Sequence, residues 1–387
     1  MRLLRQILVL TYLGLLGIPR RKWTSLVLVG SVACVIGVLV SMLSVTAGML
    51  RAYRSGEDPR LAIVLGPDNT TEWGHGVAAS AVGTILDAPG IAHRADGHPL
   101  GDPEVLIYIA STGVGPYVSG APLVRGIGAT GLALHPQVRI IAGRGFRSGR
   151  QELTVGAAAA RAFGLHLGDR VSLPGGSWPI VGVFADDGSV LEGEFMGDAD
   201  TLLAAGRTRG YGSVLVRLET PQAFEAFAHW IATNPDLKET AERLTHYSQR
   251  TANENAAFFT ALAYTVGCLM TLGALFGTVK LMYAAVSTRT REIATLRAIG
   301  YQPLPVAASV LLETAVLAIA GALIGVGVAW LSFDGRHTNQ ARAVFDLSVS
   351  GQLMLLGIVW ALTLALLGGV PPAFRAARRS VREAFAA

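Results

Sequence analysis

Residues 24–50 read TSLVLVGSVACVIGVLVSMLSVTAGML, an apolar run that contains no charged side chain. A helix rises 1.5 Å per residue, so this run would extend for about 40 Å and exceed the roughly 30 Å of bilayer hydrocarbon. Three more apolar blocks follow at residues 258–286, 305–332 and 352–372. The first two of these are about as long, and the last is just long enough at about 20 residues. The sequence therefore predicts a membrane protein with four transmembrane α-helices.

The composition agrees with this prediction. Apolar residues make up 51% of the chain and charged residues 15%, whereas a soluble domain averages about 25% charged residues. The only cysteines, Cys34 and Cys268, both fall inside predicted spans, so no disulfide framework is expected outside them. Basic residues near the span ends explain the net charge of +5, which gives no reason to expect nucleic acid as a partner.

The distribution of Lys and Arg predicts the orientation. Basic residues gather in residues 1–23, 287–304 and 373–387, whereas the loop at residues 333–351 carries two arginines offset by two aspartates. The positive-inside rule therefore places both termini in the cytoplasm of a bacterial-type inner membrane, with residues 51–238 in the periplasm.

The first segment, residues 1–23, carries Arg2 and Arg5 before a short apolar run. No small-x-small cleavage site follows, so a signal peptide is disfavoured. The segment is expected to form a cytoplasmic interfacial helix, with a buried re-entrant segment as the alternative.

Residues 51–238 are predicted to form a mixed α+β domain. A division of this domain into two subdomains, if there is one, is expected near residues 143–151. Residues 239–257 are polar and contain neither Gly nor Pro, so they are expected to form a helical stalk that continues into the second span. Expected strands lie at residues 61–65, 105–110, 123–127, 139–141, 171–173, 178–184 and 213–218, and expected helices at 77–87, 152–163 and 221–233.

Two features of the spans bear on how they pack. Small residues recur at four-residue spacing, as at Gly321 and Gly325, and such faces let helices approach closely in lipid. Lys280 and Glu313 are ionisable residues well inside their spans, at similar predicted depth, and an intramembrane charged pair is expected. The alternative is that Lys280 snorkels to the interface and Glu313 bonds to another helix.

Residues 287–304, between the second and third spans, are predicted to form a short amphipathic helix on the cytoplasmic face. A capping residue, an acid in the first turn, an apolar stripe and a terminating glycine fit this pattern. The residues alone leave two interpretations open. The helix is either an interfacial anchor without a partner or an element on which a partner protein docks. The residues concerned are Thr290, Arg291, Glu292, Ile293, Leu296, Arg297, Ile299 and Gly300.

This string resembles the coupling helix of ABC transporter permeases of the FtsX/MacB type, the mechanotransmission class. Residues 311–313 and 321–325 look like that family's third helix, and residues 150–156 resemble its periplasmic domain. The tail is similar too, although Ser380 stands where the family usually has Pro. The resemblance implies that an ABC ATPase subunit docks on residues 290–300, and that a second permease copy or paralogue is present. Members of this family frequently work with a periplasmic membrane-fusion protein, so the resemblance implies such a partner as well.

No catalytic, cofactor or metal site is expected in the chain itself. A Gly-x-x-x-x-Gly-Lys-Ser/Thr motif is missing from the sequence, so ATP is expected to be bound by the partner ATPase. The external histidines show no metal-ligand spacing. An acidic cluster is expected to be a solvated loop in preference to a cation site; it comprises Asp186, Asp187, Glu192, Glu194, Asp198 and Asp200.

The resemblance implies a non-catalytic permease subunit of a MacB-like system. Such a subunit couples ATP hydrolysis by the partner to periplasmic motion that exports or extracts amphiphilic cargo. Two alternatives stay open. One is FtsX-type signalling that activates cell-wall hydrolases, and the other is LolC/LolE-like lipoprotein extraction. The cargo, its direction of movement and the homo- or heterodimeric state of the permease are left open.

Overall fold

The computed structural model describes residues 2–17, 19, 22–54, 58–73, 76–108, 123–206, 210–288, 295, 302–340 and 343–378. These fall into two compact units. The helical unit comprises Met1–Ala47, Phe258–Asp334 and Ser348–Ala387, and the sheet unit comprises Gly48–Ala257 and Gly335–Leu347.

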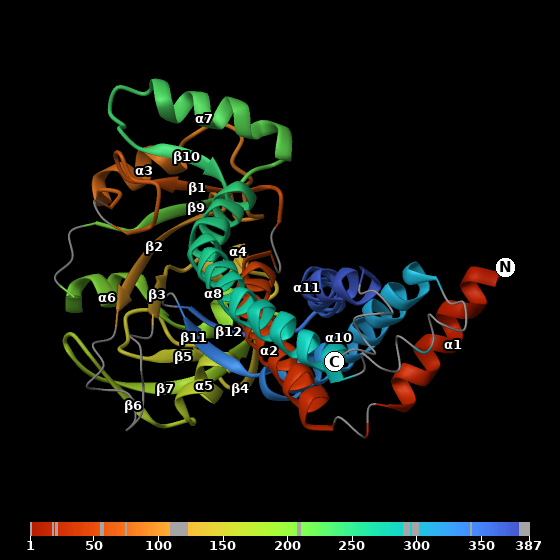
Figure 1. Cartoon of the computed structure of the whole chain (residues 1–387). Coiled ribbons are helices and arrows are strands. Elements are labelled where there is room, and N and C mark those ends of the chain that lie inside the picture. Colours follow the sequence, from red (N-terminus) through yellow and green to blue (C-terminus); the bar gives the residue numbers. More distant parts are fainter. Residues whose placement is uncertain are drawn as a thin grey trace. The chain divides into compact units, whose positions relative to one another are not determined.

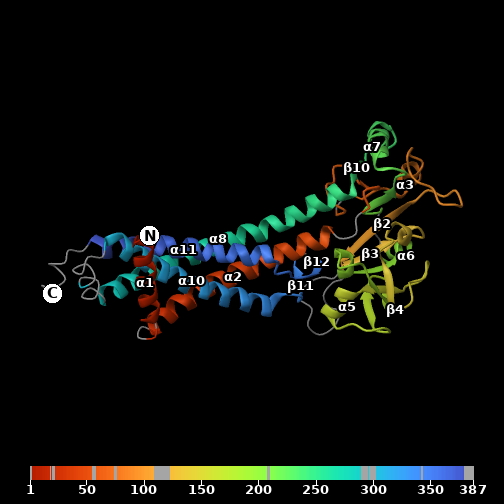
Figure 2. The same ribbon diagram turned by 90° about the vertical axis from the view of Figure 1, so that its right-hand side faces the viewer.

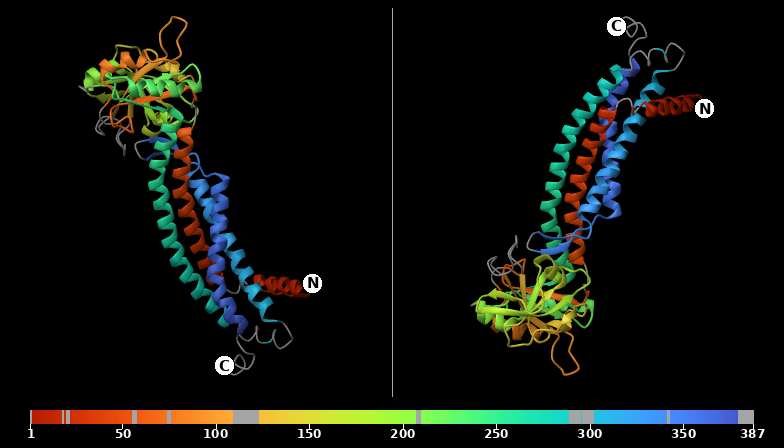
Figure 3. Two further views of the ribbon diagram at one scale, coloured as in Figure 1. Left: turned by 90° about the horizontal axis from the view of Figure 1, so that it is seen from above. Right: turned by 90° about the horizontal axis from the view of Figure 1, so that it is seen from below.

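Long apolar helices make up the helical unit. Among the described residues, four helices are long and apolar enough to cross a membrane, as the four apolar blocks predict. They lie side by side in Figure 2 and in both views of Figure 3, with the shorter α1 crossing their direction. The helices are α1 (Arg2–Leu16), α2 (Lys22–Arg54), α8 (Leu244–Thr288), α10 (Pro303–Phe333) and α11 (Gly351–Arg378).

Small residues bring α2 and α10 close together. A Cβ added at Gly321 would lie 2.7 Å from the carbonyl oxygen of Val29, and one at Gly325 would overlap the carbonyl oxygen of Ala33. The predicted small-residue contact is therefore confirmed for these two helices. On α8 the small residues divide, because a Cβ added at Gly267 would lie 2.9 Å from the Leu39 side chain of α2, whereas one at Gly273 would have no described atom within 4 Å.

The sheet unit is built on one sheet of ten strands among the described residues. The order is β10-β1-β9-β2-β3-β8-β5-β7-β4, with β6 paired to β7 (Figure 1). The strands are β1 (Leu61–Leu65), β2 (Gly101–Tyr108), β3 (Leu123–Ile127), β4 (Arg139–Gly143), β5 (Leu153–Gly156), β6 (Arg170–Leu173), β7 (Gly176–Ala185), β8 (Glu194–Asp198), β9 (Ser213–Arg217) and β10 (Thr240–Arg243).

Strand β2 joins two halves of this sheet, since its first four residues pair with β9 and its last four with β3. Each half has its own apolar core. One core packs β1 and β9 under α3 (Ala79–Leu86) and α7 (Phe224–Thr233), around Phe227. The other packs β5, β7 and β8 with α5 (Ala157–Phe163) and α6 (Ala199–Gly206), around Trp178 and Phe195.

Smaller elements complete the sheet unit. The helix α4 (Gly131–Leu134) follows β3, while the 3₁₀ helices η2 (Val190–Gly193) and η3 (Pro221–Ala223) precede β8 and α7. A hairpin of β11 (His337–Gln340) and β12 (Ala343–Asp346) lies between α10 and α11 in the sequence. Its Val344 is buried in the core around Trp178.

The predicted mixed α+β domain between the first and second spans is confirmed, but three local predictions are wrong. Residues 153–156, predicted as part of a helix, form β5, because buried pairing with β7 and β8 outweighs the Ala-rich local preference. The predicted stalk helix starts at Leu244 and not at 239, because residues 240–243 form β10 against β1. The sheet is also continuous past residues 143–151, so no subdomain boundary falls there.

Candidate functional site: a cavity around a buried arginine

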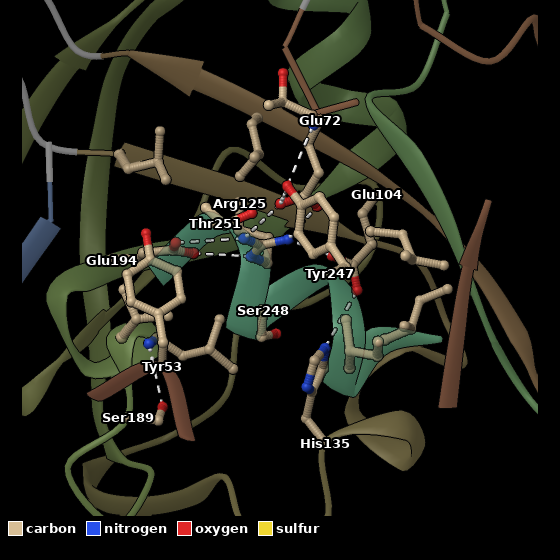
Figure 4. A pocket seen from close by; sticks show the side chains of 18 of the residues that line it. Tyr53, Glu72, Glu104, Arg125, His135, Ser189, Glu194, Tyr247, Ser248 and Thr251 are labelled. Atoms are coloured by element: carbon tan, nitrogen blue, oxygen red, sulfur yellow. Dashed lines mark hydrogen bonds and ion pairs between the residues drawn. The ribbon is translucent and has the colours of Figure 1, made fainter. Parts of the chain in front are cut away.

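A cavity of about 430 Å³ lies within the sheet unit. Its wall is formed by strands β1, β2, β3, β8 and β9, by the last turn of α2 and by the first turns of α8. Figure 4 shows Tyr53 of α2 and Tyr247 of α8 beside the polar side chains that project from the sheet. Its volume lies in the range of about 300 to 1,000 Å³ that is usual for small-molecule sites.

Arg125 occupies the centre of the polar part of this wall (Figure 4). Its Nε lies 2.8 Å from Glu194 Oε2, and its Nη1 lies 2.9 Å from Glu72 Oε1 and 2.5 Å from Glu104 Oε2. A second contact of 3.3 Å joins Nη2 to Glu194 Oε1. One guanidinium therefore holds three carboxylates, which we call the Arg125 cluster.

Strand register brings this cluster together. Arg125 of β3 stands opposite Leu106 of β2 and Met196 of β8. Because side chains alternate between the faces of a sheet, Glu104 and Glu194, two residues before those partners, lie on the same face as Arg125. Three adjacent strands thus place one positive and two negative side chains on one surface.

Polar groups outside these strands complete the cluster. The hydroxyl of Ser213 donates to Glu72 Oε1 at 3.0 Å, and that of Tyr247 lies 3.4 Å from Glu72 Oε2. His135 Nε2 lies 3.2 Å from Glu104 Oε1. The cluster thereby connects the sheet with the first turns of α8.

Burial and charge act together on these groups. Burial works to raise the pKa of Glu104, but Arg125 and His135 outweigh it and lower that pKa to about 2. Burial raises the pKa of Glu194, and Arg125 offsets only part of that effect. Burial opposes the charged form of Arg125, yet the three carboxylates hold its pKa well above its usual value. The arginine is therefore a permanent positive charge in a surplus of carboxylates.

The rest of the wall is apolar and aromatic. The rings of Trp73 and Tyr108 stack with centroids 4.3 Å apart and planes 11° apart. Aliphatic side chains cover much of the remaining surface, and they include Leu61, Ile63, Leu106, Leu123, Leu134, Leu191, Leu215 and Leu244. The cavity therefore combines an acidic end with an apolar surround.

The acidic residues expected to form a solvated loop are mostly buried, so that expectation is wrong. Asp186, Glu192, Glu194 and Asp198 are each less than 9% exposed. Local donors satisfy them, for example the backbone N–H groups of residues 186 and 188, which donate to Glu192 Oε1. Within the part of the chain that the structure describes, no group of three His, Cys, Asp or Glu residues is placed to hold a metal ion.

The residues predicted to couple to an ATPase lie outside the described residues, namely Thr290, Arg291, Glu292, Ile293, Leu296, Arg297, Ile299 and Gly300. The predicted charged pair is described. The Lys280 side chain on α8 is exposed and that of Glu313 on α10 is buried. The salt bridges between described residues do not include this pair, and the pairing of Lys280 with Glu313 stays a prediction.

Sequence reasoning missed the Arg125 cluster. One signal was present, because Arg125 is the only charged residue in the apolar strand LVRGI at 123–127. A charged side chain inside a buried strand needs a partner of opposite charge. The partners could not be identified from sequence, since they come from residues 72, 104 and 194.

The geometry defines a class of protein, a membrane protein with four spanning helices and an α/β domain inserted between the first two. Residues 24–233 match the family model described as MacB-like periplasmic core domain, and residues 264–381 match FtsX-like permease C-terminal. The first match covers more than half of the 387 residues. The chain belongs to this family of ABC transporter permeases, which confirms the resemblance inferred from the sequence.

Two relatives illustrate the likeness. The chain is 26% identical over 129 residues to the "Uncharacterized ABC transporter permease YknZ" of Bacillus subtilis (strain 168), a match that covers 33% of this chain and 32% of the relative. The chain thus matches about a third of that relative's length. A crystal structure of "the extracellular domain of noncanonic ABC-type transporter YknZ from Gram-positive bacteria" is 16% identical. That match covers 47% of this chain and 98% of the other, with a TM-score of 0.35.

Proposed function

We propose that the chain is the permease subunit of an ABC transport system in which a separate ATPase docks on residues 287–304. Hydrolysis by that ATPase drives a conformational change of the extracytoplasmic sheet unit, which exports or extracts amphiphilic cargo. The chain itself binds no ATP and catalyses no reaction. Family membership and the missing nucleotide-binding motif support a separate ATPase.

The continuity of α8 is the observation that carries this proposal. The helix begins at Leu244, directly after β10, and its first turns line the cavity with Tyr247, Ser248 and Thr251. The whole helix contains 45 residues and no proline, and it ends at Thr288, inside the proposed docking segment. At 1.5 Å per residue this is about 68 Å of unbroken helix. A helix without a break passes a displacement at one end to the other, since kinks arise at proline or at defects in the hydrogen-bond ladder.

The partners follow from the same proposal. A second permease copy or paralogue completes the membrane part, both termini face the cytoplasm, and a periplasmic membrane-fusion protein receives the cargo. The positive-inside distribution supports this orientation. The cavity favours transport over signalling to a cell-wall hydrolase. A signalling protein needs a surface that binds a partner protein, whereas a pocket of this volume is typical of small-molecule sites.

Co-purification tests ATPase docking. The tagged full chain is extracted from its native membrane in mild detergent, and mass spectrometry quantifies any co-purified protein that carries a Gly-x-x-x-x-Gly-Lys-Ser/Thr motif. We expect Glu292→Ala with Arg297→Ala to lose the ATPase, because both changes lie in the docking segment. Undiminished ATPase in that double variant would contradict the proposal.

The matched control is Arg139→Ala with Asp187→Ala. It also removes one base and one acid, here from an exposed ion pair of 2.7 Å in the sheet unit. We expect this control to retain the ATPase at the wild-type ratio. Equal loss in both double variants would indicate general instability of the complex and would remove the support for docking at residues 287–304.

A further inference from the structure

We propose that the cavity around Arg125 binds an amphiphilic organic cation, a compound with an apolar body and a positively charged nitrogen or phosphorus centre. This inference names the class of cargo, and as a statement about cargo it rests on the proposed transport function. The argument uses the charge of the cavity wall, its aromatic surface and one unsatisfied hydroxyl.

Charge selects a cation. The described residues of the wall include five carboxylates and one guanidinium. Three of the carboxylates already contact Arg125, and Asp186 belongs to the wall without contacting it. The fifth, Glu254, has a side chain that is 61% exposed and lies 3.6 Å from Arg250 Nη1, so its charge is screened by water and by that arginine. The four buried or nearly buried carboxylates interact more strongly with a ligand charge, since the effective dielectric falls away from water. An anion would therefore be repelled, whereas a cation would balance the surplus.

The apolar surround selects an organic ion over a hydrated one. The stacked rings of Trp73 and Tyr108 lie in the wall, as do the ring of Tyr53 and the aliphatic side chains of the sheet. Aromatic faces attract cations through their quadrupole, by about 0.5 to 2 kcal/mol per contact. The leucine-rich remainder gives an apolar body a surface on which to pack.

A buried hydroxyl without a partner belongs to one residue of the wall. The Oγ1 atom of Thr251, on the first turns of α8, is buried without a hydrogen-bond partner among the described residues. A buried polar atom left unpaired costs about 1 to 3 kcal/mol, which a ligand would recover only by drawing this hydroxyl into the cavity. Because Thr251 lies on α8, a bound ligand would contact the same helix that ends inside the proposed docking segment.

The test measures binding to the full chain in lipid nanodiscs, without ATP or ATPase. Tetraphenylphosphonium is the probe, and tetraphenylborate has the same shape with the opposite charge. Equilibrium dialysis gives bound probe, and nanodiscs without protein give the lipid background to subtract. We expect saturable binding of the phosphonium and none of the borate. Saturable binding of both ions, or of neither, would overturn the proposal.

Two double variants separate the cavity from the rest of the domain. Asp186→Asn with Glu254→Gln removes two charges from the wall, and we expect about tenfold weaker phosphonium binding, which corresponds to about 1.4 kcal/mol. The control is Asp187→Asn with Glu225→Gln, two acids whose side chains are 60% and 82% exposed outside the wall. We expect it to bind as the wild type does. Equal binding by the two double variants would contradict the cavity as the site.

Trp73→Leu provides an independent variant with an unchanged charge. It removes one of the stacked rings, and we expect severalfold weaker phosphonium binding from the lost cation–π contact. Unchanged affinity in this variant would count against the cavity. Because the ATPase takes no part in these measurements, their failure would leave the docking proposal standing. If the Glu292→Ala with Arg297→Ala variant lost the co-purified ATPase but still bound phosphonium, the result would bear on ATPase docking and not on the cavity.

Discussion

Arg125 Nη1 lies 2.5 Å from Glu104 Oε2, across two adjacent antiparallel strands that pair with each other in register. Both residues are almost completely buried, at 8% and 3% exposed. Charges that leave water to this extent are tolerated only when they are paired and hydrogen-bonded. The pair therefore depends on β2 and β3 keeping their register, and a slip of one strand by one residue would place the two charges on opposite faces of the sheet.

Replacing Arg125 with Met should therefore destabilise the sheet unit severely. The change leaves three buried or nearly buried carboxylates without their common partner, and breaking a buried ion pair costs about 3 to 5 kcal/mol. Chemical unfolding of the purified chain, followed by tryptophan fluorescence, measures the loss. The control Arg139→Met breaks an exposed pair with Asp187 and should cost less than about 1 kcal/mol. Similar costs for the two variants would contradict the role given to the Arg125 cluster.

Asp102 predicts a second effect, which depends on pH. Burial raises the pKa of its carboxyl from 3.8 to about 6, against donation from Thr130 and the backbone of Gly128. Because the folded state binds this proton more tightly than the unfolded state does, protonated Asp102 stabilises the fold below pH 4. That contribution to the free energy of unfolding is lost as the pH rises from 4 through 6. We expect Asp102→Asn to remove this dependence, so that the variant gains up to about 3 kcal/mol relative to the wild type between pH 4 and 7. Parallel pH profiles of unfolding would refute this.

Glycine packing predicts a third effect, on the helical unit. A methyl group at Gly325 would overlap the carbonyl oxygen of Ala33, whereas one at Gly327 would have no described atom within 4 Å. Gly325→Ala should therefore separate α2 from α10 at a cost of about 1 to 3 kcal/mol, as overpacking does. Gly327→Ala should be neutral within about 0.5 kcal/mol. Thermal unfolding in detergent compares the two, and equal midpoints would show that the helices do not approach as described.

The fourth prediction concerns Lys280 and Glu313. Because the first side chain is exposed and the second is buried, we expect Lys280→Gln to be mild and Glu313→Gln to be harmful. Effects of residues without a shared contact add within about 0.5 kcal/mol. A double-mutant cycle on thermal stability in nanodiscs measures this. A coupling well above that value would support the intramembrane pair predicted from the sequence.

The sequence predicted the elements whose signal is local. A span needs only an unbroken run of about 20 apolar residues, and residues 24–50 satisfy that condition without reference to any other part of the chain. Strand β1 was equally clear, since its five residues are apolar and lie between polar segments. The coupling segment was recognised through a resemblance, and its function stays a prediction.

The sequence could not reveal elements that depend on distant partners. Residues 153–156 became a strand because β7 and β8 lie on either side of them, although the following alanines favour a helix. Polar residues 240–243 became an edge strand because β1 was available to pair with them. The candidate site was hidden for the same reason, since Arg125 meets Glu72 and Glu194 across 53 and 69 residues of sequence.

The hairpin β11–β12 has a practical consequence for anyone who wishes to study the extracytoplasmic domain as a soluble fragment. Val344 is buried against the core around Trp178, and the backbone of Val344 lies against Gly193. Excising residues 48–257 would discard this segment and expose the apolar surface beneath it. The domain is thus formed by two separate segments of the chain. A soluble fragment that keeps its core would have to join residues 335–347 to residues 48–257 through a designed linker.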